Sequence, residues 1–151
     1  MAPFFVSFTT PGGLIGFTYG STVIELPGAP STHQAVLDLQ KSIAMDYGAT
    51  SAILLTWDFL PDSSSHPSGS SPYGYFLTYF HISRNTGGPG SISILREHVI
   101  GSLVDLRFVE EYIRSDNQAG EVHLMSCKAL KDPTPQLLQG YEELQRSLNP
   151  E

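Results

Sequence analysis

Apolar residues in the two halves of the chain recur at a fixed spacing, and such an internal repeat constrains the fold more than any other feature. The first strands match at an offset of 71 residues, as Phe5 with Phe76. The later elements match at an offset of 70: Val36 with Leu106, Leu39 with Val109, Ile43 with Ile113, Leu54 with Leu124, and Leu60 with Leu130. The change of offset falls in connections, where a change of length costs little. The sequence therefore predicts two copies of one unit.

The first copy, residues 1–60, has the pattern of a β-β-α-β unit. We expect a strand at 4–9, a Pro-Gly-Gly turn at 11–13, a strand at 14–26, a helix that follows Ser31 or Thr32 and stops at Gly48, and a strand at 51–59. Gln34, three places after Ser31, completes a capping-box pattern. Residues 52–55 are apolar at every position, so the last strand is expected in the centre of a sheet.

The second copy, residues 73–131, follows a Ser-, Pro- and Gly-rich segment at 61–72 that predicts a mobile linker, with His66 in solvent. Its expected elements are a strand at 75–80, a glycine-rich turn at 85–90, a strand at 91–97, a helix capped by Ser102 and Asp105, and a strand at 121–128. Residues 132–151 are expected to hold a C-terminal helix at about 134–147.

Each such unit would leave sheet edges open. Two units can pair edge to edge about a pseudo-twofold axis. The expected fold class is therefore α+β: two tandem β-β-α-β repeats that form one mostly antiparallel, six-stranded sheet with helices on one face, plus the C-terminal helix. The repeats could pack within one chain or swap between chains as a homo-oligomer.

Composition excludes several classes of protein. The chain has 151 residues, of which 40% are hydrophobic, enough for a real core. Its net charge of −7 argues against binding to nucleic acid or to an acidic membrane surface. No segment has the pattern of a signal peptide or a membrane span. A single cysteine fits a reducing compartment, so we expect a cytoplasmic protein.

The candidate catalytic and ligand-binding groups have simpler structural explanations. Cys127 and His123 would stand about 13 Å apart on one strand, too far to form a thiol–imidazole pair. The five histidines lack the spacing of a metal site, and we expect neither a metal nor a cofactor. The glycine pairs lead into strands, which favours hairpin turns over phosphate loops. Thr32 and Ser102 remain generic anion sites at helix N-termini.

Aromatic residues are the most suggestive group in the sequence. They lie near strand ends or on one face of a strand, where they can fill the core or form a stacking platform or partner interface. The group comprises Phe17, Tyr19, Trp57, Phe59, Tyr73, Tyr75 and Tyr79. Tyr73-Gly74-Tyr75 borders the predicted linker, so this is where an exposed apolar patch, if there is one, is to be looked for.

The first copy resembles a group of small phage and prophage proteins. The likeness covers residues 4–60 and consists of an aromatic opening strand, a glycine-rich turn, a helix that begins at Ser or Thr, and an apolar strand that ends in Trp57. The chain departs from the family pattern at Ile15-Gly16-Phe17, and the second copy has Cys127 in place of the tryptophan. The resemblance implies a phage- or mobile-element-borne accessory protein and brings no catalytic residues.

Three functions remain open at this stage. The first is a non-enzymatic accessory protein that binds and modulates a host protein. The second is a binding or sequestering protein for a small ligand such as a nucleotide signal, held in a cleft between the repeats. The third is a hydrolase that uses Cys127 and a histidine. For the first two, the candidate binding residues are Phe17, Tyr19, Trp57, Tyr73, Tyr75, Tyr79, Thr32 and Ser102.

Overall fold

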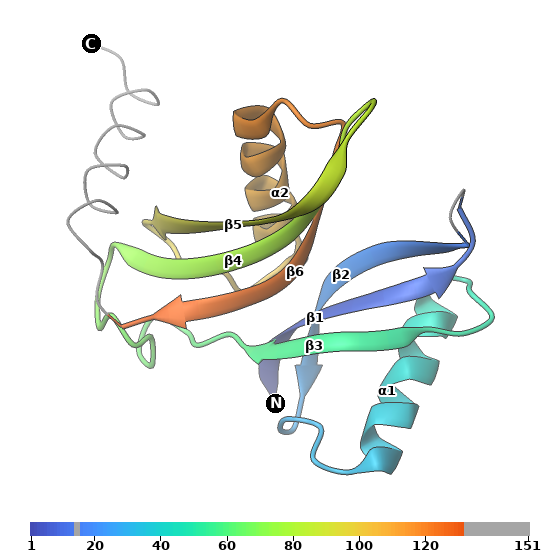
Figure 1. The fold of residues 1–151 in the computed structure, drawn as a ribbon. Helices are drawn as coiled ribbons and strands as arrows, with labels where there is room; N and C mark the ends of the chain where they lie inside the picture. Colours follow the sequence, from blue (N-terminus) through green and yellow to red (C-terminus); the bar gives the residue numbers. More distant parts are fainter. Residues whose placement is uncertain (14–15, 132–151) are drawn as a thin grey trace.

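The chain forms an α+β fold with two three-stranded antiparallel sheets and two helices in a computed structural model that describes residues 1–13 and 16–131 (Figure 1). The elements in order are β1 (Ala2–Pro11), β2 (Phe17–Leu26), α1 (His33–Asp46), β3 (Ile53–Phe59), β4 (Tyr73–Ile82), β5 (Gly87–Arg96), α2 (Leu103–Asn117) and β6 (Glu121–Leu130). The order β-β-α-β thus occurs twice. The helix expected at 134–147 lies outside the described residues, as does the start of the strand expected at 14–26.

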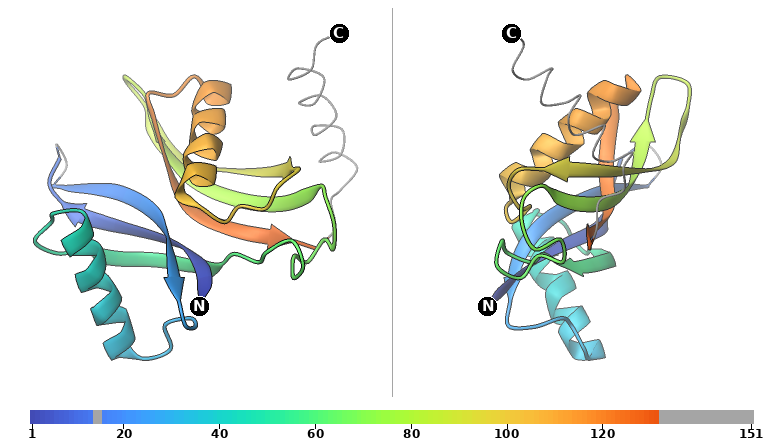
Figure 2. Two further views of the ribbon diagram at one scale, coloured as in Figure 1. Left: turned by 180° about the vertical axis from the view of Figure 1, so that it is seen from behind. Right: turned by 90° about the vertical axis from the view of Figure 1, so that its left-hand side faces the viewer.

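The strand orders are β2-β1-β3 in the first sheet and β5-β4-β6 in the second. The first strand of each copy is therefore central, and the expectation that β3 is central was wrong. The apolar run at 52–55 misled because Ile53 and Leu55 face solvent while Ala52 is buried. The single six-stranded sheet was also wrong, since the two sheets are separate and each carries its own helix (Figure 2).

The helix starts follow the capping chemistry of their sequences. Thr32 caps α1 by accepting the Ala35 N–H at 3.1 Å. Gln34 does not complete a capping box, because its side chain donates to Asp38 instead. At α2 the capping box of Ser102 and Asp105 is confirmed.

The turn predicted at 85–90 was placed too late, because β5 already begins at Gly87. The chain reverses at 83–86, where the Ser83 N–H donates to the Thr86 carbonyl at 2.7 Å. Gly90 stands inside the strand because the Tyr79 ring covers it: a Cβ there would lie 2.5 Å from that ring. Gly20 and Phe8 repeat this arrangement in the first sheet, with 2.6 Å for the same contact.

Two hydrophobic cores follow from the two sheets. The smaller has seven buried residues and fills the space between α1 and the first sheet: Phe4, Val6, Phe8, Leu39, Ile43, Ala44 and Ala52. The larger has 14 buried residues and lies mainly between α2 and the second sheet. Phe5 and Leu60 of the first copy belong to the larger core, so the second copy is built partly on the first.

The segment at 61–72 is anchored to the second sheet. His66 is 4% exposed and packs on the rings of Tyr73 and Tyr75, with centroids 4.9 and 5.1 Å away. The expectation of a solvated His66 was therefore wrong, because its ring packs against the two tyrosine rings at the start of β4. Within residues 1–13 and 16–131, no helix has both the length and the apolar character needed to cross a membrane.

Candidate functional site

The two copies meet where β6 crosses one face of the first sheet. Alternation along β1 turns Phe4, Val6 and Phe8 toward α1 and turns Phe5 and Ser7 to the opposite face. We call this opposite face the inner face; it carries Phe5, Ser7, Ser21, Val23, Thr56 and Asp58, which are register partners across the three strands. Ser7 is fully buried there, which shows how closely the second copy covers it.

Side chains of the inner face occupy the free edge of β6. The Met125 carbonyl accepts from the hydroxyls of Ser7 and Thr56 at 2.9 and 2.6 Å. The Cys127 N–H donates to the Asp58 carboxylate at 2.9 Å, and Lys128 pairs with the same carboxylate. Backbone groups at a sheet edge normally seek another strand. Here the Met125 carbonyl and the Cys127 N–H are satisfied by hydroxyls and a carboxylate, so the middle of the β6 edge is closed to another strand.

A cleft of about 500 Å³ opens beside this contact, between β2, α2 and β6. Its lining includes Tyr19, Ser21, Tyr47, Arg107, Arg114 and His123, together with Glu110, Glu111 and Glu121. Arg107 donates to Glu110 at 2.8 Å and to the Ser21 carbonyl at 2.9 Å, and Arg114 pairs with Glu111. The cationic groups are thus already matched by carboxylates.

Cys127 is fully buried, and burial, together with the charge of Asp58, raises the pKa of its thiol to about 12. A thiol with such a pKa is protonated at neutral pH and is a poor nucleophile. A pocket of about 290 Å³ touches Cys127, Asp58 and Lys128, and its lining includes no histidine. Over residues 1–13 and 16–131, no group of three His, Cys, Asp or Glu side chains is placed to hold a metal ion.

The structure disperses the predicted binding residues. Tyr73, Tyr75 and Tyr79 lie in the core beneath α2, so of the two roles open to these aromatics they fill the core and form no exposed platform. The Tyr75 hydroxyl accepts the Ile100 N–H at 2.8 Å, and burial raises its pKa to about 12. The three rings stand at odd-numbered positions of β4, so they share the face of the strand that is turned toward α2.

The two helix N-termini do not line the cleft. At α2 the Asp105 carboxylate already accepts from the Gly101 and Ser102 N–H groups, at 3.0 and 3.1 Å. Burial opposes ionisation of Asp105, but these bonds and the charge of Arg96 still hold its pKa below 3.8. An anion would meet this carboxylate at Ser102, so the anion site expected there is disfavoured.

Three of the six aromatic residues among the predicted binding residues reach the surface, and two of the three are neighbours. Phe17 and Tyr19 are adjacent on one face of β2, with ring centroids 5.4 Å apart, and Tyr19 also lies 5.3 Å from Phe80 and 6.1 Å from His123. Tyr19 thus joins the two copies at the mouth of the cleft. Trp57 stands apart from them, on β3.

The edge strand β3 carries an exposed apolar surface that we call the open edge, formed by Ile53, Leu55, Trp57 and Phe59. Their exposed fractions are 62%, 38%, 37% and 50%. Leu60 donates its N–H to Pro3 of β1 at 3.0 Å. Backbone groups alternate in direction along a strand, so those of Trp57 and Phe59 point away from β1, toward the open side.

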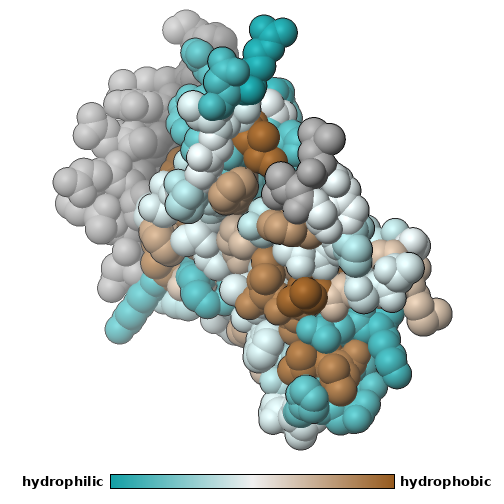
Figure 3. Space-filling view, turned by 45° about the vertical axis from the view of Figure 1, so that its right-hand side comes forward, coloured by the Kyte–Doolittle hydropathy of each residue, from teal (hydrophilic) through white to brown (hydrophobic). Residues whose placement is uncertain are grey.

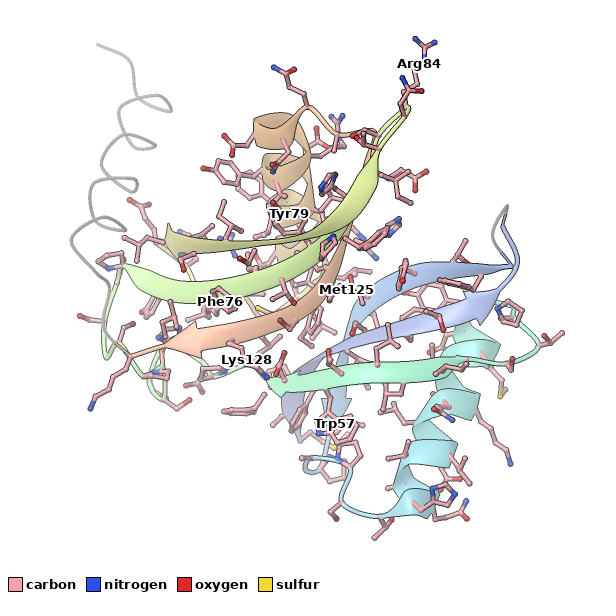
Figure 4. All side chains as sticks on the ribbon, viewed as in Figure 1. Trp57, Phe76, Tyr79, Arg84, Met125 and Lys128 are labelled. Carbon is pink, nitrogen blue, oxygen red and sulfur yellow. The ribbon has the colours of Figure 1, made fainter. Side chains whose placement is uncertain are left out.

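The positions on β6 that correspond to the open edge are His123, Met125, Cys127 and Ala129, and none of them is in the exposed class. Figure 3 shows hydrophobic side chains at the surface in the lower half of the molecule, where the first copy lies. Figure 4 places Met125 and Lys128 on β6 where it passes the first sheet, and Trp57 on the side of β3 turned away from β6. Trp57 and Phe59 were predicted from the sequence as candidates, whereas Ile53 and Leu55 were not. The available signal was that Ile53 and Leu55 continue the every-second-residue spacing of Trp57 and Phe59.

No known family model matches the sequence, and no curated protein shows significant similarity to it.

Proposed function

We propose that this chain is a protein-binding protein that uses the open edge as its docking surface. The observation that carries the proposal is the exposure of four large apolar side chains along one edge strand, at positions where the second copy is covered. A partner strand can add to such an edge through backbone hydrogen bonds, while alternate side chains supply specificity. Aromatic anchors such as Trp57 are typical of binding hot spots.

The resemblance of residues 4–60 to phage and prophage proteins favours a host protein as the partner, in a non-enzymatic accessory role. The net charge of −7 supports this class, because it favours neither nucleic acid nor an acidic membrane as the target. A thiol hydrolase receives less support, since catalysis needs a thiolate and the burial of Cys127 disfavours one.

Photo-cross-linking in cells that make the protein tests this proposal. A photoreactive residue is placed at Leu55 or at Phe59, and at Met45 as a control, because Met45 is highly exposed on α1, outside the open edge. We expect another protein chain to be trapped from positions 55 and 59 and not from position 45. Equal trapping from all three positions, or none from any, would count against a docking edge.

Small-ligand binding is the second candidate, favoured by the cleft of about 500 Å³ with Tyr19 and Tyr47 in its lining. Two arginines face three glutamates there, so a ligand with hydrogen-bonding and aromatic groups fits better than a multiply charged phosphate. Thermal shift with nucleotides and with nucleosides separates these ligands. A ligand at about 100 times its Kd should stabilise the fold by about 2.7 kcal/mol, and no shift with either class would remove this candidate.

A further inference from the structure

The two copies correspond in the details that build the contact between them. In the first sheet the pairing of β1 with β3 slips between Ser7 and Phe8, which leaves Leu55 as the extra residue of a β-bulge. In the second sheet the slip lies between Thr78 and Tyr79, and Met125 is the extra residue. Leu55 and Met125 therefore occupy equivalent places.

A hydroxyl pair flanks each bulge. Ser7 and Thr56 lie 2.8 Å apart in the first sheet, and Thr78 and Ser126 lie 2.6 Å apart in the second. Within the chain the Ser7–Thr56 pair binds the Met125 carbonyl of the other copy. Over residues 1–13 and 16–131, the Thr78–Ser126 pair makes side-chain hydrogen bonds only within itself. The internal contact joins a hydroxyl face, on the first sheet, to a bulged edge, on β6. The equivalent hydroxyl face of the second sheet and the equivalent bulged edge of β3 take no part in it.

We infer that a second copy of this chain docks on the open edge, with β3 of one copy resting on the Thr78–Ser126 face of the other as β6 rests on the inner face within each chain. This inference rests on the proposed function and deepens it by naming the partner. The occupant follows from continuity with an existing contact, since the chain already makes this interface once between its own halves. A host protein would then compete with the second copy for the same edge.

The side chains at the equivalent positions make the second contact more apolar than the first. Phe76, which is 37% exposed, takes the place of the buried Phe5 on the receiving face. On the docking side, Ile53 replaces His123 and Leu37 replaces Arg107, and both are exposed. Burial of these apolar residues favours association, and it takes the place of the polar contacts that His123 and Arg107 make within the chain.

One element of the internal contact has no counterpart. Asp58 accepts the Cys127 N–H within the chain, but the position equivalent to Asp58 is Lys128, which has no acceptor. The contact between copies therefore lacks one charge-assisted hydrogen bond. We expect it to be weaker than the internal one and to depend on protein concentration.

The contact joins an edge to a face, so it is head-to-tail. After two copies have met, the first still offers a face and the second still offers an edge, and further copies can add. The wild-type chain should therefore form a series of oligomers or a closed ring.

Mixing two blocked variants of the full-length chain tests this geometry. Leu55→Lys places a charge on the docking edge, and Thr78→Lys places one on the receiving face. Each variant alone should sediment as a monomer where the wild type self-associates. An equimolar mixture should form a one-to-one dimer and nothing larger, because one intact edge meets one intact face.

Controls keep the result interpretable. Val104→Lys changes an exposed apolar residue of α2 outside both surfaces and should self-associate as the wild type does. If circular dichroism shows that Thr78→Lys does not fold, Phe76→Lys carries the same test on the receiving face.

The inference is overturned if the wild type is monomeric at every accessible concentration, or if the mixture stays monomeric. A monomeric wild type that still traps another protein from position 55 removes the second copy and leaves the proposed function standing. No trapping and no self-association would remove both.

Discussion

The strands β3 and β6 hold the same position in their two copies, yet one has an open edge and the other a closed one. The edge of β6 is closed because Ser7, Thr56 and Asp58 of the first copy bind its backbone. The edge of β3 has no third copy to close it. Repeats that stack in a row always leave one end of this kind, which must be capped or used. The same repeat that builds the fold therefore also leaves the open edge exposed.

The second copy also has the larger of the two hydrophobic cores, and this difference gives the largest predicted effect. Ile113 and Ile43 are equivalent and equally buried, but Ile113 belongs to the core of 14 buried residues and Ile43 to the core of seven. A cavity in the larger core is enclosed on more sides and can collapse less. We expect Ile113→Ala to lower the free energy of unfolding by about 4 kcal/mol and Ile43→Ala by about 2–3 kcal/mol.

Urea denaturation of the two alanine variants measures this difference. Because Phe5 and Leu60 of the first copy belong to the larger core, we expect the two copies to unfold in one transition. Two separate transitions in the wild type would show that the second copy does not depend on the first in this way, and a larger loss from Ile43→Ala would contradict the predicted order of the two cores.

The hydrogen bonds at the two edges give the next effect. Asp58 accepts the buried Cys127 N–H at the closed edge, and Gln40 accepts the Leu54 N–H at the open edge, at 3.0 Å. Loss of a buried acceptor leaves its donor without a partner, so Asp58→Ala should cost about 2–3 kcal/mol. Water can replace Gln40 at the open edge, and Gln40→Ala should cost less than about 1 kcal/mol.

Chemical denaturation of Asp58→Ala, Gln40→Ala and the exposed control Asp38→Ala gives these values. Asp58→Asn keeps a side-chain acceptor and should recover part of the loss. If Asp58→Ala were no more costly than Gln40→Ala, the β6 edge would be as open to water as that of β3.

The sequence predicted the repeat well because helix faces and capping residues are local signals. The order of elements, the Thr32 and Ser102 caps, and the buried faces at Leu39, Ile43, Val109 and Ile113 all follow from spacing and side-chain chemistry. The arrangement of the sheets could not be predicted in this way, because strand order depends on which edge of a sheet a strand distant in sequence pairs with. Gly90 was assigned to a turn because a glycine that admits a neighbouring ring looks the same in sequence as one that reverses the chain.

The candidate site was harder to predict than the fold. Trp57 was chosen as an aromatic residue and does reach the surface, but Tyr73, Tyr75 and Tyr79 were chosen on the same ground and are buried. Residue type cannot separate these cases. The deciding fact is position in the sheet: the three tyrosines lie on a central strand within the larger core, while Trp57 lies on an edge strand and is 37% exposed.

The 61–72 segment belongs to the junction between the copies and gives the smallest predicted effect, on the pH dependence of stability. Burial lowers the pKa of His66 from 6.5 because the charged ring is poorly solvated between Tyr73 and Tyr75. The unfolded chain then binds a proton at a higher pH than the folded chain does. Stability should fall as the pH drops from 6.5 toward the lower folded pKa, and the fall should end below that value.

His66→Gln should flatten this part of the curve, while His98→Gln, at an exposed histidine, should leave it unchanged. The carboxylates of Asp62 and Asp105 do not interfere, because their pKa values lie below 3.8 and they stay ionised in this range. Urea denaturation at a series of pH values between about 7.5 and about 5 gives the slope. A slope that survives in His66→Gln would place the titrating group elsewhere and would show that His66 does not hold the segment against the second sheet.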